Sequence, residues 1–264
     1  MLELGEKLRD RYWLGTALHT CSNAASLRGE WQVSREFGER SLALGPNDPP
    51  ALGVLALLEN EVGDSSKGRH YLERLLEVMA VSPPGARAAY SFPVLIIPLA
   101  ARINGRDDLF EVATEAAHVV LSSTSAPSAY TVTARAGLGF MAAYSADAES
   151  AREQYTALRH EGGKLTVLTA SVDRLLGLLV HTMGEPSIAV THFEDALEFC
   201  RKAGYRPELA WTCCDYADAL LQRAGDGDRS KATSLLDESL AISSELGMRP
   251  LMERVLSRRE ILRA

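Results

Sequence analysis

The stretch at residues 173–197, DRLLGLLVHTMGEPSIAVTHFEDAL, decides the fold. Each half carries a stripe of small or apolar side chains at the spacing of an amphipathic helix. The stripe residues are Leu176, Gly177 and Val180 in the first half and Ala189, Phe193 and Ala196 in the second. Gly184 lies between the halves, where a glycine commonly ends a helix. Since small residues let two helices approach closely around Phe193, the stretch predicts a helix–turn–helix hairpin.

The rest of the chain repeats related units. GERSL at residues 38–42 is echoed by LERLL at 72–76, and LEFCRKAGYRP at 197–207 is echoed by LAISSELGMRP at 240–250. The spacing between echoes is longer toward the C-terminus. Such internal repetition is typical of helical repeat proteins.

The pattern L-G-x-x-V…G…A-x3-F-x2-A at residues 176–196 resembles the tetratricopeptide repeat (TPR). The resemblance implies an all-α fold, a right-handed α-solenoid of about six TPR-like helix hairpins with a C-terminal capping helix. Residues 1–264 would form one array. Its units are expected at residues 12–46, 50–80, 86–122, 128–160, 165–203 and 208–247, with the capping helix at 250–263. The third unit is degenerate, because Pro93 and Pro98 lie within its first helix and should kink or interrupt it.

The C-terminal units carry a more specific resemblance. ELAWTCCDYAD at residues 208–218, SLLDESL at 234–240 and ELGMRP at 245–250 are similar to the helical arms of bacterial LuxR-type transcriptional regulators with a STAND-class ATPase. They are also similar to the arms of multidomain adenylate or guanylate cyclases. The resemblance implies a non-catalytic scaffold for a protein or peptide partner in a signalling regulator. The alternative is a ligand-sensing arm that controls an ATPase, cyclase or DNA-binding output domain located elsewhere.

The composition of the chain argues against a membrane-spanning protein and against a nucleic-acid binder. The chain has 264 residues, is 46% hydrophobic and carries a net charge of −7, so it can build a core and lacks the basic balance of a nucleic-acid binder. The longest apolar stretch, residues 94–101, is shorter than the roughly 20 residues that span a bilayer. Four cysteines without a Cys-x-x-Cys pair fit a reducing compartment. We therefore expect a cytoplasmic protein with no membrane and no direct nucleic-acid contact.

The sequence also contains no recognisable motif for catalysis or for cofactor binding. The phrase Gly162-Gly163-Lys164 lacks the spacing of a phosphate-binding loop, and Gly137-Leu138-Gly139 has no preceding strand for a dinucleotide site. The six histidines are scattered along the chain. The sequence predicts no enzyme, no cofactor and no metal, although groups that meet only in space escape this reasoning.

The two ends of the chain raise separate expectations. The arginines of residues 249–263 could contact nucleic acid, but a capping helix with solvated arginines is favoured. Residues 4–11 resemble the tail of a repeat's second helix, so the array would begin inside a hairpin. We therefore expect an uncapped N-terminal end, covered by a longer array, by another chain or by end-to-end self-association.

In tetratricopeptide arrays the first helix of each unit lines a concave groove, and each unit contacts only its neighbours. The resemblance places seven residues there as candidates for partner binding. They are Ser171, Arg174, Leu178, His181, Trp211, Asp218 and Gln222. Arg174 could pair with a partner's carboxylate and Trp211 could be an apolar anchor. The competing interpretation is that these are ordinary helix-surface residues and that Trp211 belongs to the core. The partner is a protein or peptide, with a small-molecule effector also possible.

Overall fold

The computed structural model describes residues 10–166 and 169–263, and this part of the chain is all-helical, as the sequence predicts. It contains thirteen α-helices and one pair of two-residue strands. No helix within the described ranges is long and apolar enough to cross a membrane. Residues 4–9, which carry most of the N-terminal repeat-tail prediction, lie outside the described residues.

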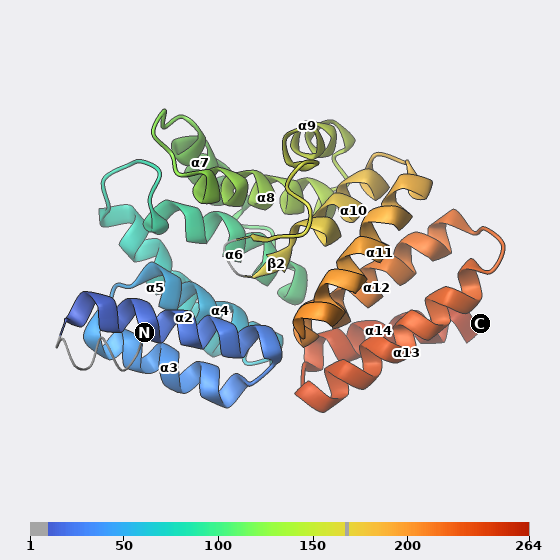
Figure 1. Ribbon diagram of the computed structural model, residues 1–264, viewed down its shortest axis with the longest axis horizontal. Helices are drawn as coiled ribbons and strands as arrows, with labels where there is room; N and C mark the ends of the chain where they lie inside the picture. Colours follow the sequence, from blue (N-terminus) through green and yellow to red (C-terminus); the bar gives the residue numbers. More distant parts are fainter. Residues whose placement is uncertain (1–9, 167–168, 264) are drawn as a thin grey trace.

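Helices adjacent in sequence pack against one another (Figure 1). The packed neighbours are α2 (Arg11–Arg28) with α3 (Trp31–Leu44), α4 (Pro49–Glu61) with α5 (Ser65–Val81), α6 (Ala88–Asn104) with α7 (Phe110–Leu121), α8 (Ser128–Tyr144) with α9 (Ala148–Leu158), α10 (Val172–Thr182) with α11 (Pro186–Ala203), and α12 (Arg206–Arg223) with α13 (Asp228–Leu246). The last helix, α14 (Arg249–Arg263), lies on α13.

The even-numbered helices α2 to α12 form a succession in which each contacts the next. Helix α12 also contacts α2, so the succession returns to its start. Figure 1 shows the result, with the blue N-terminal helices and the red C-terminal helices next to each other. The side chains that face inward from these helices are therefore enclosed from several directions.

Polar contacts join the two ends of the chain. The Trp31 indole N–H donates to the backbone carbonyl of Leu246 at 2.7 Å. Arg249 donates to the backbone carbonyls of Val62 at 3.1 Å and Gly63 at 3.0 Å. The expectation that each unit contacts only its neighbours is therefore wrong for the first and last helices, because the chain curves far enough to bring them together.

Helix α6 runs unbroken through both of its prolines, so of the expected kink or interruption the interruption is wrong. Pro98 has no N–H to donate to the Val94 carbonyl one turn earlier. That carbonyl faces Gly137 of α8, where an added Cβ would lie 2.3 Å from the oxygen. The helix remains continuous because most of it is buried between neighbours, and this burial outweighs the lost backbone bonds.

Residues at both ends of α10 explain where this helix begins and ends. Gly184 adopts a left-handed conformation, φ 80°, directly after α10, where the sequence places a helix end.

The antiparallel strands β1 (Leu165–Thr166) and β2 (Ala170–Ser171) precede α10 and were not expected. Strands of two residues are too short to show the alternation by which sequence reasoning finds them. They deliver Ser171 to the N-cap of α10, where its side chain accepts the Arg174 backbone N–H.

Candidate binding groove

A groove of about 670 Å³ lies among the even-numbered helices, on the side of α14. Helices α6, α8, α10, α12 and α14 contribute to its lining, together with Phe110 at the start of α7. Its lining side chains include Arg102, Phe110, Tyr144, Leu178, His181, Asp218 and Arg254. The groove therefore combines apolar and aromatic walls with a charged floor.

Of the seven residues expected in the groove, the structure places three in its lining and four elsewhere. Leu178, His181 and Asp218 line it. Gln222 is exposed near the end of α12, outside this lining. The other three predicted residues are buried on the inner side of the helices: Ser171, Arg174 and Trp211.

Arg174 is already paired within the chain. Its Nε donates to Glu208 at 2.7 Å and its Nη1 to Asp215 at 3.1 Å. Burial opposes the charged form of Arg174, but the Glu208 carboxylate and smaller contributions from Tyr144 and Cys200 together outweigh it, so the pKa of Arg174 is raised. The expected pairing with a partner's carboxylate is therefore wrong, because α12 supplies both acids.

Trp211, which was expected to be an apolar anchor for a partner, is not accessible from the groove either. Its indole N–H lies 2.9 Å from each carboxylate oxygen of Glu61 on α4. Burial raises the pKa of Glu61 to about 7, although the Trp211 N–H opposes this by favouring the carboxylate. The interpretation of Trp211 as a core residue fits the structure, since its side chain is buried where the two ends of the chain meet.

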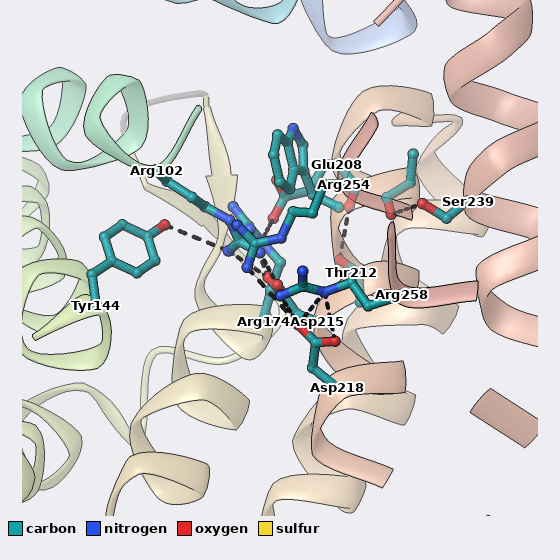
Figure 2. A network of polar contacts seen from close by, with 12 residues as sticks. Arg102, Tyr144, Arg174, Glu208, Thr212, Asp215, Asp218, Ser239, Arg254 and Arg258 are labelled. Atoms are coloured by element: carbon teal, nitrogen blue, oxygen red, sulfur yellow. Dashed lines mark hydrogen bonds and ion pairs between the residues drawn. The ribbon is translucent and has the colours of Figure 1, made fainter. Parts of the chain in front are cut away.

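Arg102 lies at the centre of this charged cluster, and sequence reasoning missed it. Its side chain is 4% exposed, and its Nη1 donates to Asp215 at 2.6 Å. The guanidinium also stacks over Trp211, 4.5 Å from the ring centroid. Its buried Nε has no hydrogen-bond partner. Figure 2 shows Tyr144, Arg174 and Asp215 converging on it. No signal in the sequence identifies Arg102, because its partners come from distant helices.

A small cavity of about 50 Å³ also borders Arg102. Trp31, Arg174, Glu208 and Trp211 contribute to it. Arg102 lines both this cavity and the groove. Burial lowers the pKa of Arg102, and the nearby charges of Arg254 and Arg174 lower it further.

The C-terminal helix completes the groove. Arg258 forms a bidentate contact with Asp218. Its Nε donates to Oδ1 at 3.0 Å and its Nη2 donates to Oδ2 at 3.1 Å. Arg254 reaches the same carboxylate only at 3.8 Å, and its buried Nε has no hydrogen-bond partner. The expectation that the arginines of this helix are simply solvated is wrong for these two, because α14 turns them toward α12 (Figure 2).

The floor of the groove can accept an acidic group. Asp218 is shared by Arg254 and Arg258, and Asp215 is shared by Arg102 and Arg174. The buried Nε atoms of Arg102 and Arg254 have no hydrogen-bond partner. Burial lowers the pKa of His181, so this side chain lines the groove as a neutral imidazole at pH 7. An anionic group with an apolar body would match both the floor and the walls.

Comparison with known proteins does not assign the chain to a family. No protein-family model matches the chain, and no curated protein matches it. The described part of the chain thus defines an all-helical protein with a charged groove lined by several of its helices.

Proposed function

We propose that the chain is a non-catalytic, TPR-like scaffold that binds a segment of a protein partner in the groove. In this proposal its helices form a right-handed solenoid of about six hairpins with a capping helix, and the chain is the helical arm of a bacterial signalling regulator. The observation that supports it best is the groove itself, which six helices line with aromatic walls and an arginine-bearing floor. Interfaces of this type gain most of their affinity from a few buried aromatic and arginine anchors.

The floor suggests the chemistry of the bound segment. Arg254 is about a third exposed, at 30%, and among the described residues it forms an ion pair with Asp218 alone, at 3.8 Å. A carboxylate entering the groove would offer Arg254 a closer acceptor. Leu178, Phe110 and Tyr144 would pack against the apolar part of the same segment. We expect a segment with one acidic residue flanked by apolar ones.

A displayed library of random peptides tests this function. Peptides selected on the wild-type chain should contain an acidic residue next to apolar residues. Their affinity should fall by about tenfold or more in Arg254→Ala, the typical effect of losing a charge-assisted contact. Arg259→Ala is the matched control, since Arg259 lies on the same helix and pairs with Asp237 at 2.9 Å outside the groove. If selected peptides bind both variants as well as the wild type, the groove is not their site.

The size of the groove favours a second candidate, the sensing of a small molecule. A volume of about 670 Å³ lies within the roughly 300–1,000 Å³ of small-molecule sites. In that case organic acids with apolar bodies should raise the melting temperature of the wild type in a saturable way. The same acids should give a smaller shift with Arg254→Ala. Stabilisation by acids with no peptide selected would favour the sensor over the scaffold.

A further inference from the structure

A second polar cluster lies between the N-terminal turn of α10 and the middle of α11. Asp173, His192 and Asp195 each place one potential ligand atom so that all three atoms lie within 4.8 Å of one another. None of the three lines the groove. Their side chains are of the types that bind divalent metal ions.

The fold brings these residues together from two helices. His192 and Asp195 are three residues apart on α11, so they share one face of the helix. Asp173 is the second residue of α10, which packs against α11. The close approach depends on Gly177, where an added Cβ would lie 3.0 Å from the Phe193 ring. The cluster is therefore a consequence of the hairpin that residues 173–197 encode.

Neighbouring groups hold two of the three side chains. The Gly163 backbone N–H donates to Asp173 Oδ2 at 2.7 Å. The Tyr155 hydroxyl lies 3.2 Å from His192 Nε2. Each contact engages one of the two potential ligand atoms of its residue. Metal-binding histidines and carboxylates are commonly oriented by such outer contacts.

The local charge also favours a cation. Asp173 is only 5% exposed, and a buried carboxylate without a counter-charge is unfavourable. The strongest charged neighbours of Asp173 are Asp195 and His192. Among the described residues no lysine or arginine forms an ion pair with Asp173 or Asp195. The nearby Lys164 pairs with Glu161 instead, at 2.7 Å.

From this arrangement we propose that Asp173, His192 and Asp195 bind a divalent transition-metal ion, with Zn²⁺ preferred over Mn²⁺. Imidazole suits zinc, whereas Mg²⁺ and Ca²⁺ prefer sites made of oxygen ligands alone. With bonds of about 2 Å, zinc holds its ligand atoms about 3–4 Å apart. The exposed Asp195 side chain closes the remaining distance on binding. The bound ion ties α10 to α11, a role that is independent of the groove and its partner.

Metal titration of the full-length chain tests the site. After treatment with a chelator, the chain is titrated by calorimetry with ZnCl₂, MnCl₂, MgCl₂ and CaCl₂, and its melting temperature is followed in parallel. We expect one zinc ion per chain, weaker manganese binding and a rise in melting temperature with zinc. His192→Ala and Asp195→Asn should each lower zinc affinity by about tenfold or more, and Tyr155→Phe should lower it less.

His181→Ala is the matched control, because His181 is a half-buried histidine on α10 outside the cluster. Its zinc affinity should equal that of the wild type. Asp195→Asn keeps the test valid if His192→Ala fails to fold, since Asp195 is exposed. No zinc-dependent stabilisation at up to about 1 mM, or wild-type zinc affinity in Asp195→Asn, would overturn the proposal.

Discussion

Glu61 is the residue whose ionisation bears most directly on stability. Burial raises its pKa from 4.5 to about 7. The folded state therefore holds this proton more tightly than the unfolded state does. The stabilisation from the protonated carboxyl is complete below about pH 4.5 and is lost as the pH rises through about 7.

Glu61→Gln should remove this dependence. Glutamine cannot ionise, and its amide oxygen can still accept the Trp211 N–H. We expect the variant to be more stable than the wild type at pH 8, by up to about 3 kcal/mol, with the gain shrinking toward pH 5. Urea denaturation of both proteins at pH 5 and pH 8 measures the difference. A constant difference between the two pH values would show that Glu61 does not titrate in this range.

Asp215 neutralises two buried arginines, so its loss should be severe. Asp215→Asn leaves Arg102 and Arg174 without this shared carboxylate, and breaking a buried pair typically costs about 3–5 kcal/mol. Asp218→Asn is the comparison, because Asp218 is 31% exposed and its pairs should contribute about 1 kcal/mol or less. Chemical denaturation gives both values. Equal losses would contradict the central role of Asp215.

At the scale of elements, the crossing of α6 and α8 depends on one glycine. Gly137→Ala would place a Cβ 2.3 Å from the rigid Val94 carbonyl, so the helices must move apart. We expect a loss of about 2–4 kcal/mol in the free energy of unfolding. For Gly139→Ala, on the same helix, the nearest atoms are the side-chain ends of Leu175 and Leu179, from 3.3 Å, so stability should change by less than about 1 kcal/mol. Similar losses in the two variants would mean that the crossing is not as close as described.

The same element shows where sequence reasoning succeeds and where it fails. Helical periodicity and the glycine at position 184 predict the helical class and the end of α10, because both are local properties. The two prolines of α6 predict an interruption that is absent. Proline disfavours a helix interior locally, whereas the burial of Val94, Ile96 and Ile97 between other helices is a tertiary effect. Sequence alone does not reveal which of these effects is larger.

At the scale of the molecule, the charged cluster exists because the chain returns to its start. Arg102 meets Asp215 and Glu61 meets Trp211, and both contacts join residues more than a hundred positions apart. Nothing in the sequence near any of these residues specifies its partner. The groove residues Leu178, His181 and Asp218 could be placed from the repeat pattern, but the curvature that buries Arg174 and Trp211 could not.

The contact between the two ends can be tested through Trp31. Trp31→Ala removes the hydrogen bond to Leu246 together with apolar packing, so we expect a loss of about 2–4 kcal/mol and faster amide exchange near the end of α13. Trp13→Ala is the control, since Trp13 is 55% exposed and its replacement should change stability by less than about 0.5 kcal/mol. Unchanged exchange in Trp31→Ala would indicate that the ends are not held together by this contact.

Binding in the groove is the central claim, and hydrogen exchange of the full-length chain with and without a library-selected acidic peptide tests it most directly. The account predicts slower exchange at the helix segments that line the groove, in the C-terminal halves of α8 and α10 and in α14. Arg254→Ala should abolish this protection at the same peptide concentration, and Arg259→Ala should retain it. Protection confined to the outer helices α5, α9 and α11, with the groove segments unchanged, would contradict the account.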